Sequence, residues 1–133
     1  MTTWMLVEDE PDLHEMLHHM IEGIGHRVLG FSDGEEAHEW IDYVDSDAAE
    51  NPTLPELALI DIRLPGKTSG VEVAARLRRS PALQHTAVVL MTAYRLSAEE
   101  ETRIMNEAMP DMLLYKPLPA FHVFRRKLED LLM

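Results

Sequence analysis

The 133-residue sequence predicts an α/β fold, in which helices cover both faces of a parallel sheet. Two observations predict it. Short apolar runs of strand length recur along the chain, and they lack the alternation of strands that have one exposed face. Segments with helical periodicity separate these runs, so that strand and helix alternate along the whole sequence. Such an order indicates right-handed crossovers between parallel strands.

The expected strands are rich in Val, Ile, Leu and Met, as strands buried on both faces are. In chain order they are Trp4–Val7, Arg27–Phe31, Leu57–Ile60, Ala87–Met91 and Met112–Tyr115. The polar stretch Asp45–Pro55 precedes the third strand and is expected to form a surface loop. No internal repeat divides the sequence, so we expect residues 1–133 to form one domain.

Helix start signals follow the strands. Pro11 suits a first helical position, ahead of an apolar face of Leu13, Leu17, Met20, Ile21 and Ile24. Three Ser/Glu pairs have the spacing of a capping box: Ser32 with Glu35, Ser69 with Glu72, and Ser97 with Glu100. Pro119 is expected to open a last helix with an apolar side of Phe121, Phe124, Leu128 and Leu131.

Negative charge is concentrated in the first half of the chain. The net charge is −12; residues 1–62 hold 16 acidic residues against one basic residue, and residues 63–133 hold 8 against 11. This excess argues against a general electrostatic surface for nucleic acid. The members of two basic groups are expected on solvated helix faces: Arg76, Arg78 and Arg79, and then Arg125, Arg126 and Lys127.

The composition excludes further classes of protein. Cysteine is absent, which fits a reducing cytoplasm and excludes disulfide scaffolds, thiol catalysis and Cys-based zinc sites. No apolar run approaches the length that spans a membrane, and Met1–Glu10 lacks the basic start of a signal peptide. We therefore expect a cytoplasmic protein that binds neither membrane nor nucleic acid.

Residues suited to phosphate chemistry stand at the ends of the expected strands. They are Glu8-Asp9-Glu10 after the first strand, Asp61 after the third, Thr92-Ala93 after the fourth and Lys116-Pro117 after the fifth. Ligands of open parallel sheets bind beyond the carboxyl ends of strands, so three or four carboxylates, a hydroxyl and an ammonium should meet there. Crowded carboxylates need a cation, and Mg²⁺ prefers oxygen ligands. With Mg²⁺ present, one carboxylate can attack a phosphoryl group and form an aspartyl phosphate.

The sequence resembles the receiver domain of bacterial two-component response regulators over nearly its whole length. The motifs that carry the resemblance are Leu6–Pro11, Leu59–Gly66, Leu90–Ala93 and Tyr115–Pro117. It implies a doubly wound, flavodoxin-like sheet of five parallel strands in the order 2-1-3-4-5. It also implies a single receiver over residues 1–133, without an output domain and not a turnover enzyme.

The resemblance also assigns roles to individual residues. Asp61 would be the phosphoacceptor, Thr92 would hydrogen-bond the phosphoryl group, and Lys116 would pair with it. Mg²⁺ would be held by Asp61, by Asp9 directly, by Glu8 through water, and by the backbone carbonyl of Arg63. The peptide between Lys116 and Pro117 would be cis.

The resemblance further implies what the receiver contacts. The phosphoryl donor would be a histidine kinase or a phosphotransfer protein. The signal would leave through a changed surface around the last two helices and the last strand. Its recipient would be an unknown downstream protein or a second copy of the chain.

Two departures from the family concern the switch and the loss of phosphate. The family usually has an aromatic residue three positions before the lysine, where this chain has Leu113. Tyr115 shares the strand parity of Leu113 and is the candidate to serve in its place. Arg63 and Tyr94 resemble positions that tune dephosphorylation, and we expect bulky Tyr94 to obstruct the attacking water and slow the loss of phosphate.

Two other functions stay open. One is an interaction module that keeps the fold without phosphorylation, which Leu113 supports. The other is a small Mg²⁺-dependent phosphatase, which would need a second acid where Arg63 stands.

The sequence also contains the pattern H-E-x-x-H over His14–His18, which matches zinc proteases. Both histidines are expected on the solvent margin of a helix, and no third ligand follows, so we expect a chance match.

Overall fold

Five parallel strands form one sheet in the computed structural model, which describes residues 2–46, 49–50 and 52–133. The elements are β1 (Thr3–Val7), α1 (Pro11–Gly23), β2 (Arg27–Phe31), α2 (Gly34–Asp45), β3 (Leu57–Asp61), α3 (Gly70–Arg79), β4 (Ala87–Thr92), α4 (Ala98–Ala108), β5 (Met112–Tyr115) and α5 (Phe121–Asp130). The strand order is β2-β1-β3-β4-β5, with parallel pairing throughout. The predicted fold class and strand order are confirmed.

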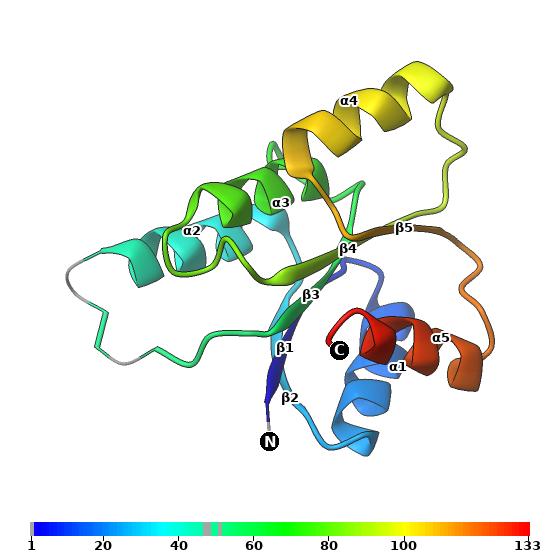
Figure 1. Ribbon diagram of the computed structural model, residues 1–133, viewed down its shortest axis with the longest axis horizontal. Coiled ribbons are helices and arrows are strands. Elements are labelled where there is room, and N and C mark those ends of the chain that lie inside the picture. The colour runs from blue at the N-terminus through cyan, green and yellow to red at the C-terminus, as the bar shows by residue number, and fades with distance from the viewer. Residues whose placement is uncertain (1, 47–48, 51) are drawn as a thin grey trace.

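Helices cover both faces of the sheet, with α1 and α5 on one side and α2, α3 and α4 on the other (Figure 1). Alternate residues of each strand enter the two cores. In β1, Met5 and Val7 pack beneath α2–α4, whereas Trp4 and Leu6 pack beneath α1 and α5. Burial on both faces explains why the strand sequences are apolar without alternation. Among the described residues, no helix is long and apolar enough to cross a membrane.

The helix start signals are partly confirmed. Ser69 and Ser97 form complete capping boxes with Glu72 and Glu100 at the starts of α3 and α4. Pro11 is the first residue of α1, as predicted.

The capping box predicted for Ser32 and Glu35 is wrong. Asp33 is the N-cap of α2, and its Oδ1 accepts a hydrogen bond of 2.8 Å from the N–H of Glu36. Both Ser32 and Asp33 are suitable caps, and an ionised carboxylate is the stronger acceptor at a helix N-terminus. The one-residue shift releases the Glu35 carboxylate for a contact outside α2.

Other element boundaries differ from prediction as well. β1, β3 and β4 are each one residue longer than the expected strands. The last helix begins at Phe121 and not at Pro119, because the backbone of Ala120 is still extended, with ψ of 148°. Phe121 is therefore half-exposed at the helix start, while Phe124 and Leu128 form the buried side. Helix α2 includes Asp45, so the predicted loop starts after it. Residues 47, 48 and 51 of that loop lie outside the described part of the chain.

The expectation of a solvated face for the first arginine group is wrong for two of its members. The Arg78 side chain is only 12% exposed and donates hydrogen bonds to the carbonyls of Met109 and Thr86 and to the carboxylate of Asp111. It thereby joins the end of α3 to the segments that precede β4 and β5. Arg76 is similarly covered and pairs with carboxylates of α2.

Candidate functional site

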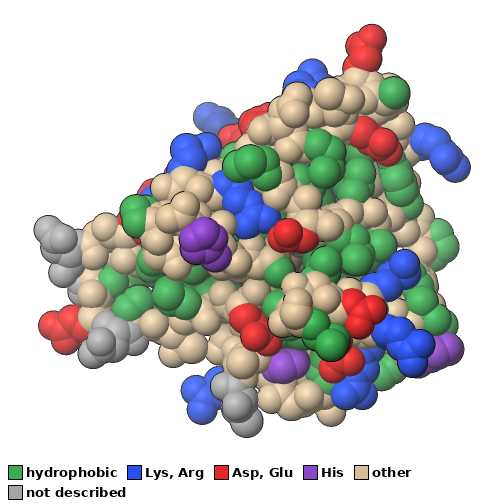
Figure 2. Space-filling model, in the orientation of Figure 1, with side chains coloured by type: hydrophobic (Ala, Val, Ile, Leu, Met, Phe, Trp, Pro, Cys, Tyr) green, Lys and Arg blue, Asp and Glu red, His purple; other side chains and the backbone are tan. Residues whose placement is uncertain are grey.

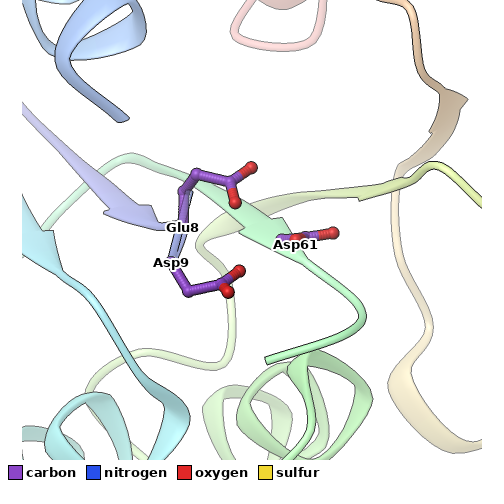
Figure 3. A group of neighbouring side chains, drawn as sticks. All are labelled: Glu8, Asp9 and Asp61. Carbon is purple, nitrogen blue, oxygen red and sulfur yellow. The ribbon is translucent and has the colours of Figure 1, made fainter. Parts of the chain in front are cut away.

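The sheet order places three carboxylates at one edge. β1 lies between β2 and β3, so Glu8 and Asp9, which follow β1, come next to Asp61 at the end of β3. Carboxylate oxygens of the three residues lie within 4.8 Å of one another, in the space between the two strand ends (Figure 3). Glu8 and Asp61 are buried, at 1% and 6% exposure, and Asp9 is exposed. This is the site at which sequence analysis predicted the metal ligands.

The turn after β1 determines which acids reach the site. The N–H of Glu8 donates to the carbonyl of Phe31 in β2, which continues the sheet by one residue. Glu10 instead caps α1, because its carboxylate accepts hydrogen bonds from the N–H groups of Asp12 and Leu13. Of the three or four carboxylates expected at this edge, three meet there and the fourth belongs to the helix cap.

Lys116 brings a positive charge to these acids. Its Nζ lies 2.8 Å from Oε1 of Glu8 and 3.4 Å from Oδ2 of Asp61. Burial by itself would lower the pKa of Lys116, but the hydrogen bond to Glu8 and the charge of Asp61 outweigh it and raise the pKa above its usual value. Lys116 is therefore a cation in this site. The peptide between Lys116 and Pro117 is cis, as predicted.

Asp61 has a perturbed carboxyl group. Burial and the negative charge of Glu8 raise its pKa to about 6, against an opposing effect of Lys116. One lysine thus offsets two buried acids only in part. A second cation near the three carboxylates would relieve the remaining repulsion, and three hard oxygen donors suit Mg²⁺.

Thr92 lies at the end of β4, beside the site. The β3–β4 register pairs Asp61 with Met91, so Thr92 follows one residue beyond the level of Asp61. Thr92 is buried, and its Oγ1 accepts a hydrogen bond of 3.1 Å from the N–H of Tyr94. That bond orients the hydroxyl and leaves its proton to donate to a ligand.

Arg63 and Tyr94, which the sequence places on separate loops, contact each other. The guanidinium carbon of Arg63 lies 3.8 Å from the centre of the Tyr94 ring, a cation–π arrangement. Arg63 follows Asp61 by two residues and Tyr94 follows Thr92 by two, so the pair joins the loops after β3 and β4. The role of the Arg63 carbonyl as a metal ligand stays a prediction.

Leu113 and Tyr115 occupy the same side of β5 but differ in their contacts. Leu113 is partly buried against the core beneath α2–α4. Tyr115 pairs with Thr92 in the β4–β5 register, and its hydroxyl donates a 2.5 Å hydrogen bond to Glu101 of α4. This bond raises the pKa of Tyr115. Tyr115 thus connects the strand end to α4 through a side-chain hydrogen bond.

Sequence reasoning missed Glu35, whose carboxylate leaves α2 and accepts hydrogen bonds from the N–H groups of Lys67 and Thr68. These residues belong to the loop that follows Asp61, and Gly66 beside them has a φ of 84°. Glu35 therefore steadies the loop that carries Arg63. No local pattern signals this contact, because it joins segments more than 30 residues apart.

In the described part of the chain, the histidine pattern is not completed by a third metal ligand. Among described residues, the group of acids or histidines that could hold a metal is Glu8, Asp9 and Asp61, without His14 or His18. His14 and His18 are both partly buried, as the margin of the helix face requires. The Nδ1 of His14 also lies 2.8 Å from the carbonyl oxygen of Glu8, a contact that the sequence did not predict.

Comparison with known proteins agrees with this geometry. The family model of the response regulator receiver domain matches residues 5–124. The phosphate regulon transcriptional regulatory protein PhoB of Pseudomonas aeruginosa is 33% identical over 116 residues, covering 86% of this chain and 45% of that protein. The polar-differentiation response regulator DivK of Brucella anthropi is 32% identical over 97 residues, covering 73% of this chain and 71% of that protein. The chain spans less than half the length of the two PhoB relatives that it matches, 45% and 40%.

Solved structures show the same fold. The receiver domain of a signal transduction histidine kinase from Syntrophus aciditrophicus superposes with a TM-score of 0.79 at 25% identity, over 99% of this chain and 90% of that one. The receiver domain of the sensor histidine kinase PA1611 from Pseudomonas aeruginosa, whose structure has a magnesium ion in its active site cleft, gives 0.76 at 22% identity, over 97% and 95%. The chain belongs to the response regulator receiver domain family of two-component signal transduction.

Proposed function

We propose that this receiver takes a phosphoryl group onto Asp61 from a phosphohistidine of a histidine kinase or phosphotransfer protein, with Mg²⁺ in the acidic site. The single observation that carries the proposal is the convergence of three carboxylates and Lys116 at the carboxyl ends of β1, β3 and β5. PA1611, a protein of the same fold, holds a magnesium ion in its cleft, which supports the choice of metal.

The residues present fit Mg²⁺. Glu8, Asp9 and Asp61 supply hard oxygen donors within 4.8 Å of one another, and the raised pKa of Asp61 marks an unrelieved negative charge. The backbone carbonyl of Arg63 is the proposed further ligand. When bound, Mg²⁺ supplies positive charge that favours the ionised form of Asp61 and offsets the charge of a phosphoryl group.

The chain's own groups account for the transfer. An Asp61 oxygen attacks phosphorus, and the bond from phosphorus to the imidazole nitrogen of the donor breaks as the new P–O bond forms. The Lys116 ammonium, 3.4 Å from Asp61, is placed to pair with a phosphoryl oxygen, and the Thr92 hydroxyl can donate to another. Positioning and charge neutralisation carry the reaction.

The phosphorylated state then signals through the face of α4, β5 and α5, toward a downstream protein or a second copy. Tyr115 is the proposed reporter, because it lies beside Thr92 in the sheet and is hydrogen-bonded to α4. Phosphorylation shifts an existing equilibrium of this face and does not create a new structure.

A phosphorylation assay tests the proposal. The protein is incubated with Mg²⁺ and a small phosphodonor, and intact mass spectrometry follows the chain. Wild type and the control Asp12→Asn, an exposed acid of α1, are expected to gain one phosphoryl group, and Asp61→Asn none. No adduct on the wild type would favour the phosphorylation-independent interaction module. Release of phosphate over many turnovers would favour the phosphatase.

A further inference from the structure

His14 has a contact that the proposed chemistry does not use. Its Nδ1 lies 2.8 Å from the carbonyl oxygen of Glu8, and a carbonyl oxygen only accepts, so Nδ1 carries the proton. The opposite side of the ring lies against β2, where a Cβ at Gly30 would come 3.1 Å from Nε2. Gly30 thus provides the space in which the imidazole reaches the turn after β1.

This turn determines where Asp9 points. The Glu8 carboxylate is held by Lys116 at 2.8 Å and by the N–H of Glu10 at 3.1 Å, and Asp61 is also held by Lys116. Within the described part of the chain, no donor hydrogen-bonds to the carboxylate of Asp9, which is exposed. Its position therefore depends on the backbone, and the peptide that joins it to Glu8 is the one whose carbonyl His14 binds.

We propose that His14 is a positioning residue for the metal site, which fixes the Glu8–Asp9 peptide and thereby aims the Asp9 carboxylate at the cation. The inference rests on the proposed function, in which Asp9 is a ligand of Mg²⁺. It gives the first histidine of the H-E-x-x-H pattern a role that needs no zinc. Hydrogen-bonded partners of metal ligands commonly matter for affinity, because they orient the ligand before the metal arrives.

Three variants isolate the hydrogen bond. His14→Leu fills a similar space but removes the donor. His14→Asn places an amide nitrogen close to the position of Nδ1 and keeps a donor. His18→Leu is the matched control, since His18 lies one turn further along α1 and pairs with Glu22 at 3.3 Å.

The measurements are Mg²⁺ affinity by calorimetry and the amide spectrum of the metal-free protein. We expect the dissociation constant for Mg²⁺ to rise about tenfold in His14→Leu. It should stay at the wild-type value in His14→Asn and His18→Leu. In the metal-free protein, we expect the Asp9 amide resonance to shift in His14→Leu but not in His14→Asn or His18→Leu. The other amide resonances of all three variants should keep the dispersion of a folded protein.

The outcomes separate this inference from the function on which it rests. Wild-type affinity in a folded His14→Leu protein overturns the role of His14 and leaves the proposed function intact. Equal weakening in His14→Leu and His14→Asn overturns the hydrogen bond as the cause. A wild-type protein that binds no Mg²⁺ overturns the proposed function, and the role of His14 with it.

Discussion

At the scale of single residues, Asp61 combines burial with an uncompensated charge. Burial and the charge of Glu8 disfavour its ionised form and raise its pKa from the ordinary 3.8 to about 6 in the folded chain. The folded protein therefore binds the extra proton between these two pH values. By linkage, the free energy of unfolding of the metal-free protein falls as the pH rises through this interval and stays lower above it. The group on which the proposed chemistry depends thus destabilises the metal-free fold at neutral pH.

The first prediction follows from this linkage. In the presence of a chelator, Asp61→Asn should raise the free energy of unfolding by about 1–3 kcal/mol above pH 7. The gain should shrink as the pH falls from about 6 and disappear below about 3, where the wild-type carboxyl is protonated in both states. Urea unfolding at several pH values measures it. A gain that is independent of pH would show that the charge of Asp61 is not its cause.

The second prediction concerns the contact of Arg63 with Tyr94. If the ring obstructs the attacking water, Tyr94→Ala should speed the loss of phosphate from Asp61. Arg63→Ala should speed it by about two- to fivefold, because a cation–π contact of about 0.5–1 kcal/mol no longer holds the ring. The decay of the phosphorylated mass gives both rates. An unchanged rate in Tyr94→Ala would contradict the proposed obstruction.

At the scale of elements, a side-chain hydrogen bond connects α4 to β5, the strand at one edge of the sheet. Tyr115 of β5 donates its hydroxyl proton to Glu101 in the first half of α4. The same strand carries Leu113 at the position where the family usually has an aromatic residue, and Leu113 packs into the core. Ile104 and Ala108 hold the second half of α4 in the core, whereas an exposed hydrogen bond connects the first half to the end of β5. The first half can therefore change its position at small energetic cost.

The third prediction tests this connection. Tyr115→Phe should accelerate hydrogen exchange in the first half of α4 without changing phosphorylation of Asp61, because only the hydroxyl is lost. Tyr43→Phe, which alters an exposed tyrosine of α2, is the control. Exchange detected by mass spectrometry, before and after phosphorylation, gives the result. Equal exchange in all three proteins would mean that Tyr115 does not restrain α4.

The elements also show what a sequence can predict. The strands and the caps of α3 and α4 depend on residues within a few positions of one another, and both were predictable. The start of α2 was not, because Ser32 and Asp33 are both suitable caps. The contacts of Glu35 and Arg78 join segments that are distant in the sequence and meet only in the fold. The contact of His14 is to a backbone carbonyl, and no pattern of side chains predicts such a contact.

At the scale of the whole molecule, the ion pair between Lys116 and Glu8 joins the acidic first half of the chain to the basic second half. The two residues are 108 positions apart and 2.8 Å apart in space. Most of the remaining charge lies on the surface, where acidic and basic side chains are interspersed on the face shown in Figure 2. Among the described residues, Glu8 and Asp61 are the buried acids, so the site holds the negative charges that burial affects most.

The fourth prediction concerns this pair. Lys116→Met leaves Glu8 buried without its cation, so the metal-free protein should lose about 2–4 kcal/mol of stability at neutral pH. Added Mg²⁺ should restore part of that loss, since a cation bound only by the folded state stabilises it. Thermal unfolding with and without Mg²⁺ measures both effects. Lys127→Met, which changes an exposed side chain of α5, is the control. An equal loss in both variants would argue against a special role for the buried pair.

The covered arginine at the end of α3 has a mechanical consequence. Arg78 binds the carbonyl of Met109, the residue that caps the far end of α4, while Tyr115 contacts the half nearer the site. Ile104 and Ala108 are also buried in the core, so this end of the helix is held as a pivot, and the start of α4 lies about 16 Å from it. Small rotations at the pivot become the largest displacements next to Thr92 and Tyr94. The hydrogen bond from Tyr115 to Glu101 therefore acts where a rotation of α4 moves the helix furthest.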